Sequence, residues 1–223
     1  MAITPTTTDP RTPRLRRRAV ATIAAALVST AAASTLAVPS AGAAPVSPAA
    51  VVSVRSADPA ALLASEALFA FAMGDMASYA RLRNELAAVI ATRLGVAPGQ
   101  MSAAWASAEV RHQRALLTAL SQLGVSYRRN SLRPGVSFDC SGLTSFAWSS
   151  VGVTIPRSSG RQIRAAAPRD ASTAQAGDLV HYPGHVMMWL GVGQAVVHAS
   201  DPSRPIEVRV IKRSSLRYGD PTG

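Results

Sequence analysis

The sequence predicts an α+β protein in which helices come first and an antiparallel sheet follows. Apolar residues recur at helical spacing in several runs between Asp58 and Gly124. In the last third of the chain the apolar period changes to two, which is typical of strands with one buried face. Between the two regions stands Cys140, the only cysteine among 223 residues. We therefore expect one compact domain with an N-terminal appendage.

The first 43 residues have the three parts of a secretory signal peptide. Five arginines form a basic start, Ala19 to Val38 is uncharged and rich in alanine, and Ala41-Gly42-Ala43 fits a cleavage site. An uncleaved membrane anchor is the alternative, because an apolar run of about 20 residues can span a bilayer. The alanine, serine and threonine content favours cleavage after Ala43, and both Sec and twin-arginine export remain open. Residues 44–57 are expected to be a flexible linker.

The net charge of +11 at pH 7 comes almost entirely from arginine, which supplies 22 of the 23 basic residues. Residues 1–43 contain five arginines and one aspartate, so the chain keeps a charge of +7 after cleavage. A moderately basic exported surface suits an anionic partner such as cell wall or a membrane surface. Nucleic acid is not expected, because the chain has neither a basic motif interleaved with aromatic residues nor zinc-finger spacing.

Residues 58–112 are predicted to form a helical region without catalytic groups. Asp58-Pro59 is typical of a helix start, and a second helix is expected to end at Gly95. A third helix is expected to begin near Ser102 and to continue to Leu120, with His112 exposed on it. Packing, docking or regulation are the roles open to this region, including a position over a catalytic cleft.

A helix is also predicted to begin at Cys140, with Asp139 as its N-cap. A thiol in the first turn of a helix faces unpaired backbone N–H groups and the positive end of the helix dipole, and both favour the thiolate. An inert buried cysteine is the alternative. Two histidines further along the chain favour the reactive interpretation.

Four strands are predicted in the last third of the chain. They run from Asp178 to Tyr182, His185 to Leu190, Gln194 to Ala199 and Ile206 to Ile211, as an antiparallel meander. If Gly191-Val192 forms a two-residue turn, His185 lies directly opposite His198 and both side chains share one face. A register slip of one residue would separate them.

Two facing histidines and one helix-capped cysteine form the arrangement of a nucleophile, its base and an orienting group. A zinc site is the alternative, but a catalytic zinc needs a third protein ligand, and no HxxH or HExxH pattern supplies one nearby. The remaining candidate ligand is His181, which is expected at a solvent-exposed edge. No metal is therefore expected.

Five stretches resemble the NlpC/P60 family of cysteine peptidases, which cut bacterial peptidoglycan. They are FDCSGL (138–143), IPRSS (155–159), AGDLVHY (176–182), GHVMMWLG (184–191) and VVHAS (196–200). The resemblance covers residues 113–223 and implies a papain-like core, in which the nucleophile helix packs on an antiparallel sheet. It implies Cys140 as nucleophile, His185 as base and His198 as the third polar residue, without a cofactor. The positions that it implies for substrate binding are Tyr127, Asp139, Ser141, Arg157 and Ser158.

The activity implied by the resemblance is that of a secreted endopeptidase that cuts peptidoglycan stem peptides at the D-glutamyl–diaminopimelate bond. Peptidoglycan is then the partner, and stable membrane insertion after signal cleavage is not expected. Two departures from the family pattern concern the substrate pocket: Arg128-Arg129-Asn130 replaces Trp-Gly-Gly, and Met187 replaces a common glycine. The alternatives are a non-catalytic wall-binding module and an amidase or acyltransferase on the same scaffold.

Overall fold

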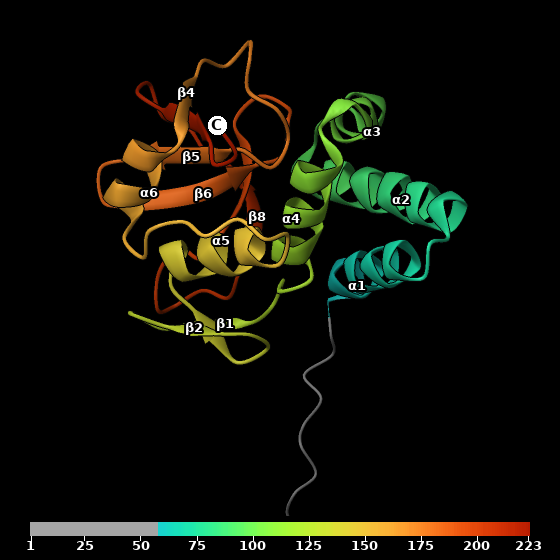
Figure 1. The fold of residues 1–223 in the computed structure, drawn as a ribbon, viewed down its shortest axis with the longest axis horizontal. Helices are drawn as coiled ribbons and strands as arrows, with labels where there is room; N and C mark the ends of the chain where they lie inside the picture. The colour runs from blue at the N-terminus through green and yellow to red at the C-terminus, as the bar shows by residue number, and fades with distance from the viewer. Residues whose placement is uncertain (1–57) are drawn as a thin grey trace, which may run out of the picture. The chain divides into compact units, whose positions relative to one another are not determined.

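A computed structural model describes residues 58–223 (Figure 1). The predicted signal peptide and linker lie outside the described residues. The helices are α1 (Pro59–Ala72), α2 (Met76–Leu94), α3 (Pro98–Ser107), α4 (Val110–Leu120), α5 (Cys140–Ser149) and α6 (Ser159–Ala165). The strands are β1 (Ser126–Tyr127), β2 (Leu132–Arg133), β3 (Ser137–Phe138), β4 (Ala167–Arg169), β5 (Leu179–Tyr182), β6 (His185–Trp189), β7 (Ala195–His198), β8 (Glu207–Val210) and β9 (Arg217–Asp220). The predicted α+β class is confirmed.

The first helix begins, and the second helix ends, where the sequence predicts. Asp58 caps α1 by accepting a hydrogen bond from the N–H of Ala60 at 3.0 Å. The same carboxylate forms an ion pair with Arg93 in the last turn of α2, at 2.7 Å. α2 ends at Gly95, whose φ of 67° is the left-handed conformation that favours glycine. Because the start of α1 meets the end of α2, the two helices are antiparallel.

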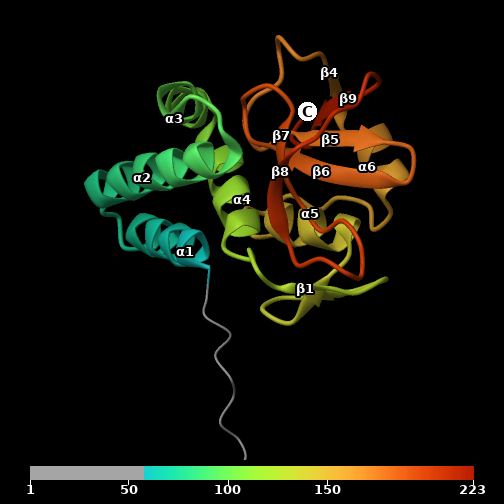
Figure 2. The same ribbon diagram turned by 180° about the vertical axis from the view of Figure 1, so that it is seen from behind.

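The predicted single helix from Ser102 to Leu120 is wrong. Pro98 begins α3, and the extended backbone of Ala108 separates α3 from α4. α4 packs against both α1 and α5, and Figures 1 and 2 both show it between the first two helices and the sheet. The boundary predicted between residues 112 and 113 falls inside this helix.

The main sheet has six strands in the order β4-β9-β5-β6-β7-β8. Strands β5 to β8 form the predicted antiparallel meander. The C-terminal strand β9 was not predicted, and it lies between β4 and β5. The face that carries Val186 and Met188 belongs to the same apolar cluster as Leu143 of α5, so α5 packs on this face (Figure 1).

A small second sheet lies between residues 126 and 138, directly before Cys140. Its order is β1-β3-β2, and β1 runs parallel to β3. Tyr127 therefore pairs with Phe138, two residues before Cys140. This pairing explains how a tyrosine that is distant in sequence reaches the start of α5.

His112 is fully buried, so its predicted exposure is wrong. Its Nε2 atom lies 3.1 Å from Oδ1 of Asp178 and 3.1 Å from Oδ1 of Asp220. The ring of Trp148 packs edge-on against the imidazole, with 4.8 Å between the ring centroids. His112 thus joins α4 to residues next to β5 and at the end of β9.

The three facing side chains bring possible metal-ligand atoms within 4.8 Å of one another. Asp220, however, already has its donors: Oδ1 accepts hydrogen bonds from the N–H and hydroxyl of Thr222, and Oδ2 pairs with Arg169 at 2.7 Å. These contacts lower the pKa of Asp220 to about 2, against the opposing effect of burial. The cluster therefore has the contacts of a buried ion-pair network.

α3 docks on the turn that follows β6. The indole N–H of Trp105 donates to the carbonyl of Leu190 at 2.9 Å. A Cβ atom on Gly191 would lie 2.8 Å from Cβ of Ala104, so glycine permits this close approach. The turn is at the opposite end of β6 from His185, which begins the strand.

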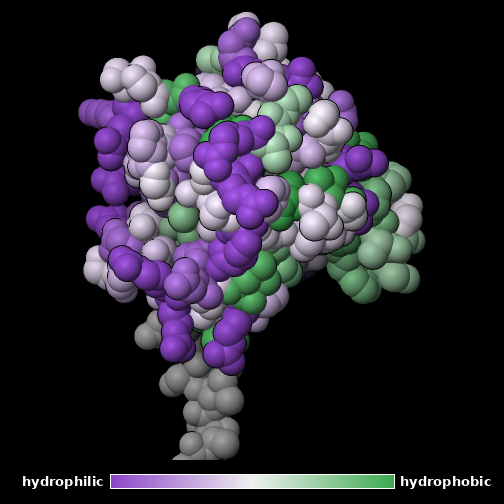
Figure 3. All heavy atoms as spheres, turned by 60° about the vertical axis from the view of Figure 1, so that its left-hand side comes forward, coloured by the Kyte–Doolittle hydropathy of each residue, from purple (hydrophilic) through white to green (hydrophobic). Residues whose placement is uncertain are grey.

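The surface of the sheet-containing region is mainly hydrophilic on the side that Figure 3 turns toward the viewer. This distribution agrees with the many exposed arginines of the chain. Within residues 58–223 no helix combines the length and the apolar character needed to cross a membrane.

Candidate active site

Cys140 begins α5, as predicted, and Asp139 caps the helix by accepting the N–H of Gly142 at 2.6 Å. The preceding chain lies directly against this first turn. A Cβ atom on Gly142 would lie 2.1 Å from the carbonyl oxygen of Ser131, a distance that no side chain can occupy. Glycine at this position therefore allows the loop to pack beside the cysteine.

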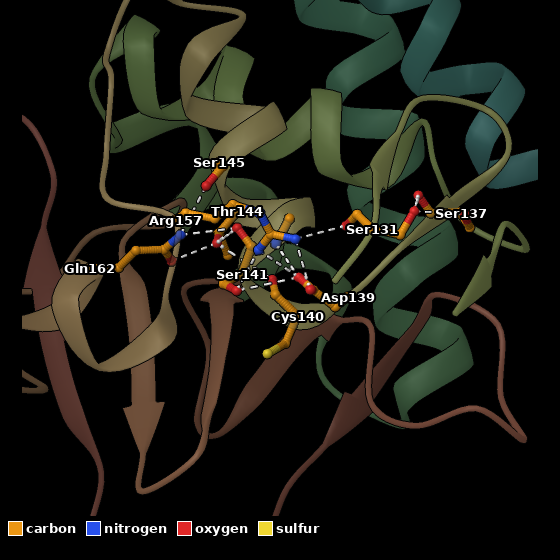
Figure 4. A network of polar contacts seen from close by, with 10 residues as sticks. Ser131, Ser137, Asp139, Cys140, Ser141, Thr144, Ser145, Arg157 and Gln162 are labelled. Carbon is orange, nitrogen blue, oxygen red and sulfur yellow. Dashed lines mark hydrogen bonds and ion pairs between the residues drawn. The ribbon is translucent and has the colours of Figure 1, made fainter. Parts of the chain in front are cut away.

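Arg157 holds the first turn of α5 from the side (Figure 4). Its guanidinium donates to the two carboxylate oxygens of Asp139 at 2.9 and 2.8 Å, and to the hydroxyl of Ser141 at 2.8 Å. A weaker contact reaches the carbonyl of Ser131 at 3.3 Å. Two parallel bonds between a guanidinium and a carboxylate fix direction as well as distance. In Figure 4 the sulfur of Cys140 points away from this network, which leaves it free to react.

Gln162 of α6 is a positioning residue that the sequence interpretation missed. Its side chain is buried, and its amide N–H groups donate to the carbonyl of Ser141 at 2.9 Å and to the hydroxyl of Ser145 at 3.0 Å. Its amide oxygen accepts from the hydroxyl of Thr144 at 2.7 Å. A glutamine residue by itself does not indicate in the sequence what its side chain touches.

The predicted register of the histidine hairpin is wrong, but the predicted face is right. Met188 pairs with Val197, so the turn contains residues 191–194 instead of two residues. When this register is extended along the two strands, His198 lies diagonally across from His185. The observed register thus differs by two residues from the predicted one, in which the two histidines were directly opposite. A shift of two residues leaves both side chains on the same face. Nε2 of His185 lies 3.0 Å from Nδ1 of His198.

Burial determines the protonation of these groups. It lowers the pKa of His185 to about 4, and the neighbouring His198 adds to the effect. It also lowers the pKa of His198, although Glu207, 3.5 Å from Nε2, opposes the shift. Burial raises the pKa of the Cys140 thiol, against hydrogen bonds from the N–H groups of Val186 and Ser141.

The resting site at neutral pH therefore holds a neutral thiol and neutral imidazoles. The thiolate expected from the helix start alone is not borne out, because desolvation outweighs the backbone N–H groups. The Cys140 sulfur contacts the N–H of Val186, so it lies next to the residue that follows His185 in β6. Nε2 of His185 faces His198, so Nδ1 is the nitrogen left for the thiol. Within residues 58–223 no hydrogen bond joins the sulfur to an imidazole. In enzymes, a contact between a nucleophile and its base can tighten when the substrate binds.

An open cleft of about 440 Å³ lies at Cys140. It is lined by Tyr127, Arg129, Asn130, Asp139, Cys140, Ser141, Arg157, Ser158 and Ser159. The structure thus brings all five residues predicted to bind substrate to one cleft with the cysteine. Arg129 and Asn130, from the segment that departs from the family pattern, form part of the same wall. No residue of α1, α2 or α3 lines this cleft.

His181 does not belong to the candidate site. It is buried on β5, not at a solvent-exposed edge as predicted, and burial lowers its pKa. It pairs across the sheet with Val186, so its side chain lies on the opposite face from His185. It is therefore not placed to complete a metal site with His185 and His198.

Residues 124–218 match the model of the NlpC/P60 family. A probable endopeptidase of Corynebacterium glutamicum is 43% identical over 91 residues, which cover 40% of this chain and 43% of that protein. Peptidoglycan endopeptidase RipB of Mycobacterium tuberculosis is 40% identical over 85 residues, or 36% of this chain and 35% of its own. The crystal structure of the P60 domain of an M. avium subspecies paratuberculosis antigen is 30% identical, with a TM-score of 0.44, over 49% of this chain and 93% of its own. Residues 124–218 form a domain of the NlpC/P60 family.

The NlpC/P60 match begins just before β1 and ends within β9, so it includes the cysteine helix and the histidine hairpin. It leaves out the four helices α1 to α4. Of these, α4 packs against α5 and α3 meets Gly191 after β6. The chain spans less than half of the length of the two curated relatives.

Proposed function

We propose that this NlpC/P60 protein is a secreted cysteine endopeptidase that hydrolyses peptidoglycan stem peptides, at the bond between D-glutamate and diaminopimelate. The observation that carries the proposal is the contact between His185 and His198 beside a cysteine at a helix start, open to a cleft. The peptidoglycan endopeptidase RipB, a relative over this region, supports the class of substrate.

In the proposed reaction, Nδ1 of His185 takes the thiol proton while the sulfur attacks the scissile carbonyl. The imidazolium then gives this proton to the leaving amine as the C–N bond breaks, and a thioester remains on Cys140. Water attacks the thioester with His185 again as base, and the proton returns to the sulfur as the C–S bond breaks. Neutral imidazole is the form required of a base, which agrees with the lowered pKa of His185.

His198 would select the tautomer of His185. If Nδ1 of His185 accepts the thiol proton, Nε2 must carry a hydrogen and donate it to Nδ1 of His198, 3.0 Å away. Nε2 of His198 then carries its own hydrogen, and Oε1 of Glu207 lies 3.5 Å from that nitrogen. Through these contacts His198 would hold the base in position, as the third member of a triad does.

The first turn of α5 would stabilise the negative oxygen of the tetrahedral intermediate. The early N–H groups of a helix have no partner within the helix. The side chain of Asp139 accepts the N–H of Gly142, and the backbone carbonyl of Asp139 accepts the N–H of Leu143. The N–H of Ser141 contacts the sulfur of Cys140, so the N–H of Cys140 is the donor left for the oxyanion in this turn.

The proposal is tested by digesting purified cell wall with the protein that starts at Ala44. Mass spectrometry should find fragments with new ends between the second and third residues of the stem peptide. The Cys140→Ala variant is the blank. Transfer of the acyl group to another amine or to a lipid would instead indicate the acyltransferase alternative. Binding to the wall without release of any fragment would replace the enzyme with a wall-binding module.

A further inference from the structure

A second open cleft, of about 640 Å³, lies beside His198. We call it the basic cleft. It is lined by Tyr182, His198, Ser200, Asp201, Arg209, Val210, Ile211, Lys212 and Arg213. It shares no lining residue with the cleft at Cys140. In the proposed reaction His185 exchanges protons through Nδ1, the ring nitrogen that does not face His198, so the hydrolytic steps leave the basic cleft unused.

The register of the last strands brings a cation of the basic cleft to the same face of the sheet as His198. Strand β8 pairs with β7 so that Glu207 is opposite His198 and Arg209 is opposite Val196. Paired residues point to the same face, and so do residues two apart on one strand, so Arg209 and His198 share a face. Val196 belongs to the second apolar cluster, whereas α5 packs on the first. His198 and Arg209 therefore lie on the face away from the nucleophile helix.

The basic cleft has an excess of positive charge. Arg209, Lys212 and Arg213 are cationic, and none of the three forms an ion pair with another residue between 58 and 223. The single carboxylate, that of Asp201, accepts hydrogen bonds from two neighbouring serines. Three cations and one carboxylate leave two positive charges uncompensated while the imidazole is neutral. These charges suit an anionic ligand.

Two of the cations lie close to the histidine pair. The guanidinium carbon of Arg213 is 4.4 Å from the centre of the Tyr182 ring, and this ring is 5.3 Å from that of His185. Burial is the main cause of the lowered pKa of His198, and the charge of Arg209 adds to it. The charge of Arg213 adds in the same way to the lowered pKa of His185. Both guanidinium groups are therefore within electrostatic reach of the rings.

Nε2 of His198 lacks a hydrogen-bond partner although the ring is buried. The residue is 4% exposed, Nδ1 faces His185, and Nε2 has no partner within residues 58–223. Oε1 of Glu207 is 3.5 Å from Nε2, which exceeds the usual length of an N–H···O bond. Both carboxylate oxygens of Glu207 already accept from Arg204, at 2.9 and 3.0 Å. A buried N–H without an acceptor costs free energy, which an oxygen held in the adjoining cleft would recover.

We propose that the basic cleft is a binding site for a phosphate dianion. One oxygen accepts the hydrogen on Nε2 of His198, the others accept from Arg209 and Arg213, and Lys212 adds its charge. Two uncompensated positive charges match a dianion, and the guanidinium fork matches the oxygens of a phosphate. Inorganic phosphate and a phosphate monoester both present this group. The inference does not depend on the proposed endopeptidase function, because binding needs no peptide.

The first test is a calorimetric titration of the purified protein with inorganic phosphate. It is made at about pH 8, where the phosphate is a dianion. Sodium chloride holds the ionic strength constant, so that screening of the charges does not change during the titration. We expect saturable binding of one phosphate per protein, with a Kd of about 1 mM or below. The absence of saturable binding would overturn the inference.

Two esters distinguish the sources of the phosphate group. Methyl phosphate is a monoester with two charges, and dimethyl phosphate is a diester with one. Similar affinities for inorganic and methyl phosphate would support a site for terminal phosphate groups as well as the free ion, and binding of inorganic phosphate alone would support a site for the free ion. Dimethyl phosphate should bind about tenfold more weakly or worse, because it lacks a charge and two oxygens that can accept strongly. Equal affinity for the diester would overturn the assignment to a dianion.

The double variant Arg209→Gln with Arg213→Gln should bind phosphate about tenfold more weakly or worse. The matched control is Arg111→Gln with Arg217→Gln, which removes the same charge. Both of these arginines are exposed and line neither cleft, and the control should keep the affinity of the unsubstituted protein. An equal loss in both double variants would overturn the site, because it would show attraction to the net charge alone. Unchanged affinity in the first variant would also overturn it.

Nitrogen NMR of the histidine rings tests the contact with His198. The Nε2 signal of His198 should shift as phosphate binds, because a hydrogen bond forms at that nitrogen. His181 is the reference within the same sample: it is also buried with unpartnered ring nitrogens in residues 58–223, but it lies on the other face of the sheet. Its signals should not change. Phosphate that binds without shifting the Nε2 signal of His198 would overturn its placement beside this ring.

Discussion

Nε2 of His185 lies 3.0 Å from Nδ1 of His198, although the two residues are diagonal and not opposite in the sheet. The contact uses one nitrogen of each ring and leaves Nδ1 of His185 for a thiol. It also places two buried imidazoles side by side, which opposes protonation of either. The pair is therefore suited to receive one proton during a reaction and to be neutral at rest.

Replacing Cys140 with Ala should abolish peptide release from cell wall while leaving the fold intact. The side chain is small and only partly buried, so its loss removes the nucleophile but little packing. Fragment release by mass spectrometry and the midpoint of thermal unfolding are the two measurements. Activity that survives in a folded Cys140→Ala protein would exclude this residue as nucleophile.

His185→Ala should reduce turnover more than His198→Ala, because the first removes the base and the second only its orientation. Loss of the orienting group in other triads lowers turnover by up to about 10⁴-fold, and we expect a large but smaller loss for His198→Ala. The measurement is kcat on a synthetic stem peptide. Wild-type turnover in His198→Ala would show that the imidazole contact has no part in the reaction.

Stability should fall in acid through the buried His185. Its pKa is about 4 in the folded protein and 6.5 in the reference state, so the unfolded chain takes up the proton first. The free energy of unfolding should decrease as the pH falls from about 6.5 to about 4, by up to about 3 kcal/mol, and this contribution should not change further below that range. Urea unfolding at a series of pH values measures it.

His185→Gln should have a shallower slope over the same pH range. Some slope should remain, because burial also lowers the pKa of His198. Identical pH dependence in both proteins would mean that His185 is not the group that takes up the proton.

His112→Ala should destabilise the protein by about 3–5 kcal/mol, because it leaves two buried carboxylates without their shared partner. His181→Ala is the matched control: His181 is equally a buried histidine, but its ring nitrogens have no hydrogen-bond partner among the residues that the structure describes. Urea unfolding at pH 7 should therefore show the larger loss for His112→Ala. Equal losses would show that the contacts with Asp178 and Asp220 add nothing to stability.

Arg157→Lys should lower kcat/KM about tenfold, since one ammonium cannot replace the two parallel bonds to Asp139. Arg161→Lys, a neighbouring substitution at an exposed arginine of α6 outside the cleft, is the control. Full activity in Arg157→Lys would indicate that the N-cap holds the first turn of α5 without the guanidinium.

The sequence alone determined the features that depend on neighbouring residues. A proline after Asp58 marks the start of α1, and Asp139 marks the start of α5, because both signals act on N–H groups of the following turn. The change of apolar period located four of the strands. The common face of His185 and His198 was also predictable, because it depends only on whether the register shift is odd or even.

Only the tertiary structure decided the features that need contact between distant segments. The turn after β6 has four residues, and Gly191 within it meets Ala104 of a helix that no local pattern connects with the hairpin. His112 looked exposed among polar neighbours, yet it is buried because Asp178 and Asp220 come to it from the other end of the chain. Local propensity extends over one or two turns of backbone, whereas the burial and charge of a side chain depend on everything that packs around it. The neutral state of the cysteine site follows from that packing, not from the start of the helix.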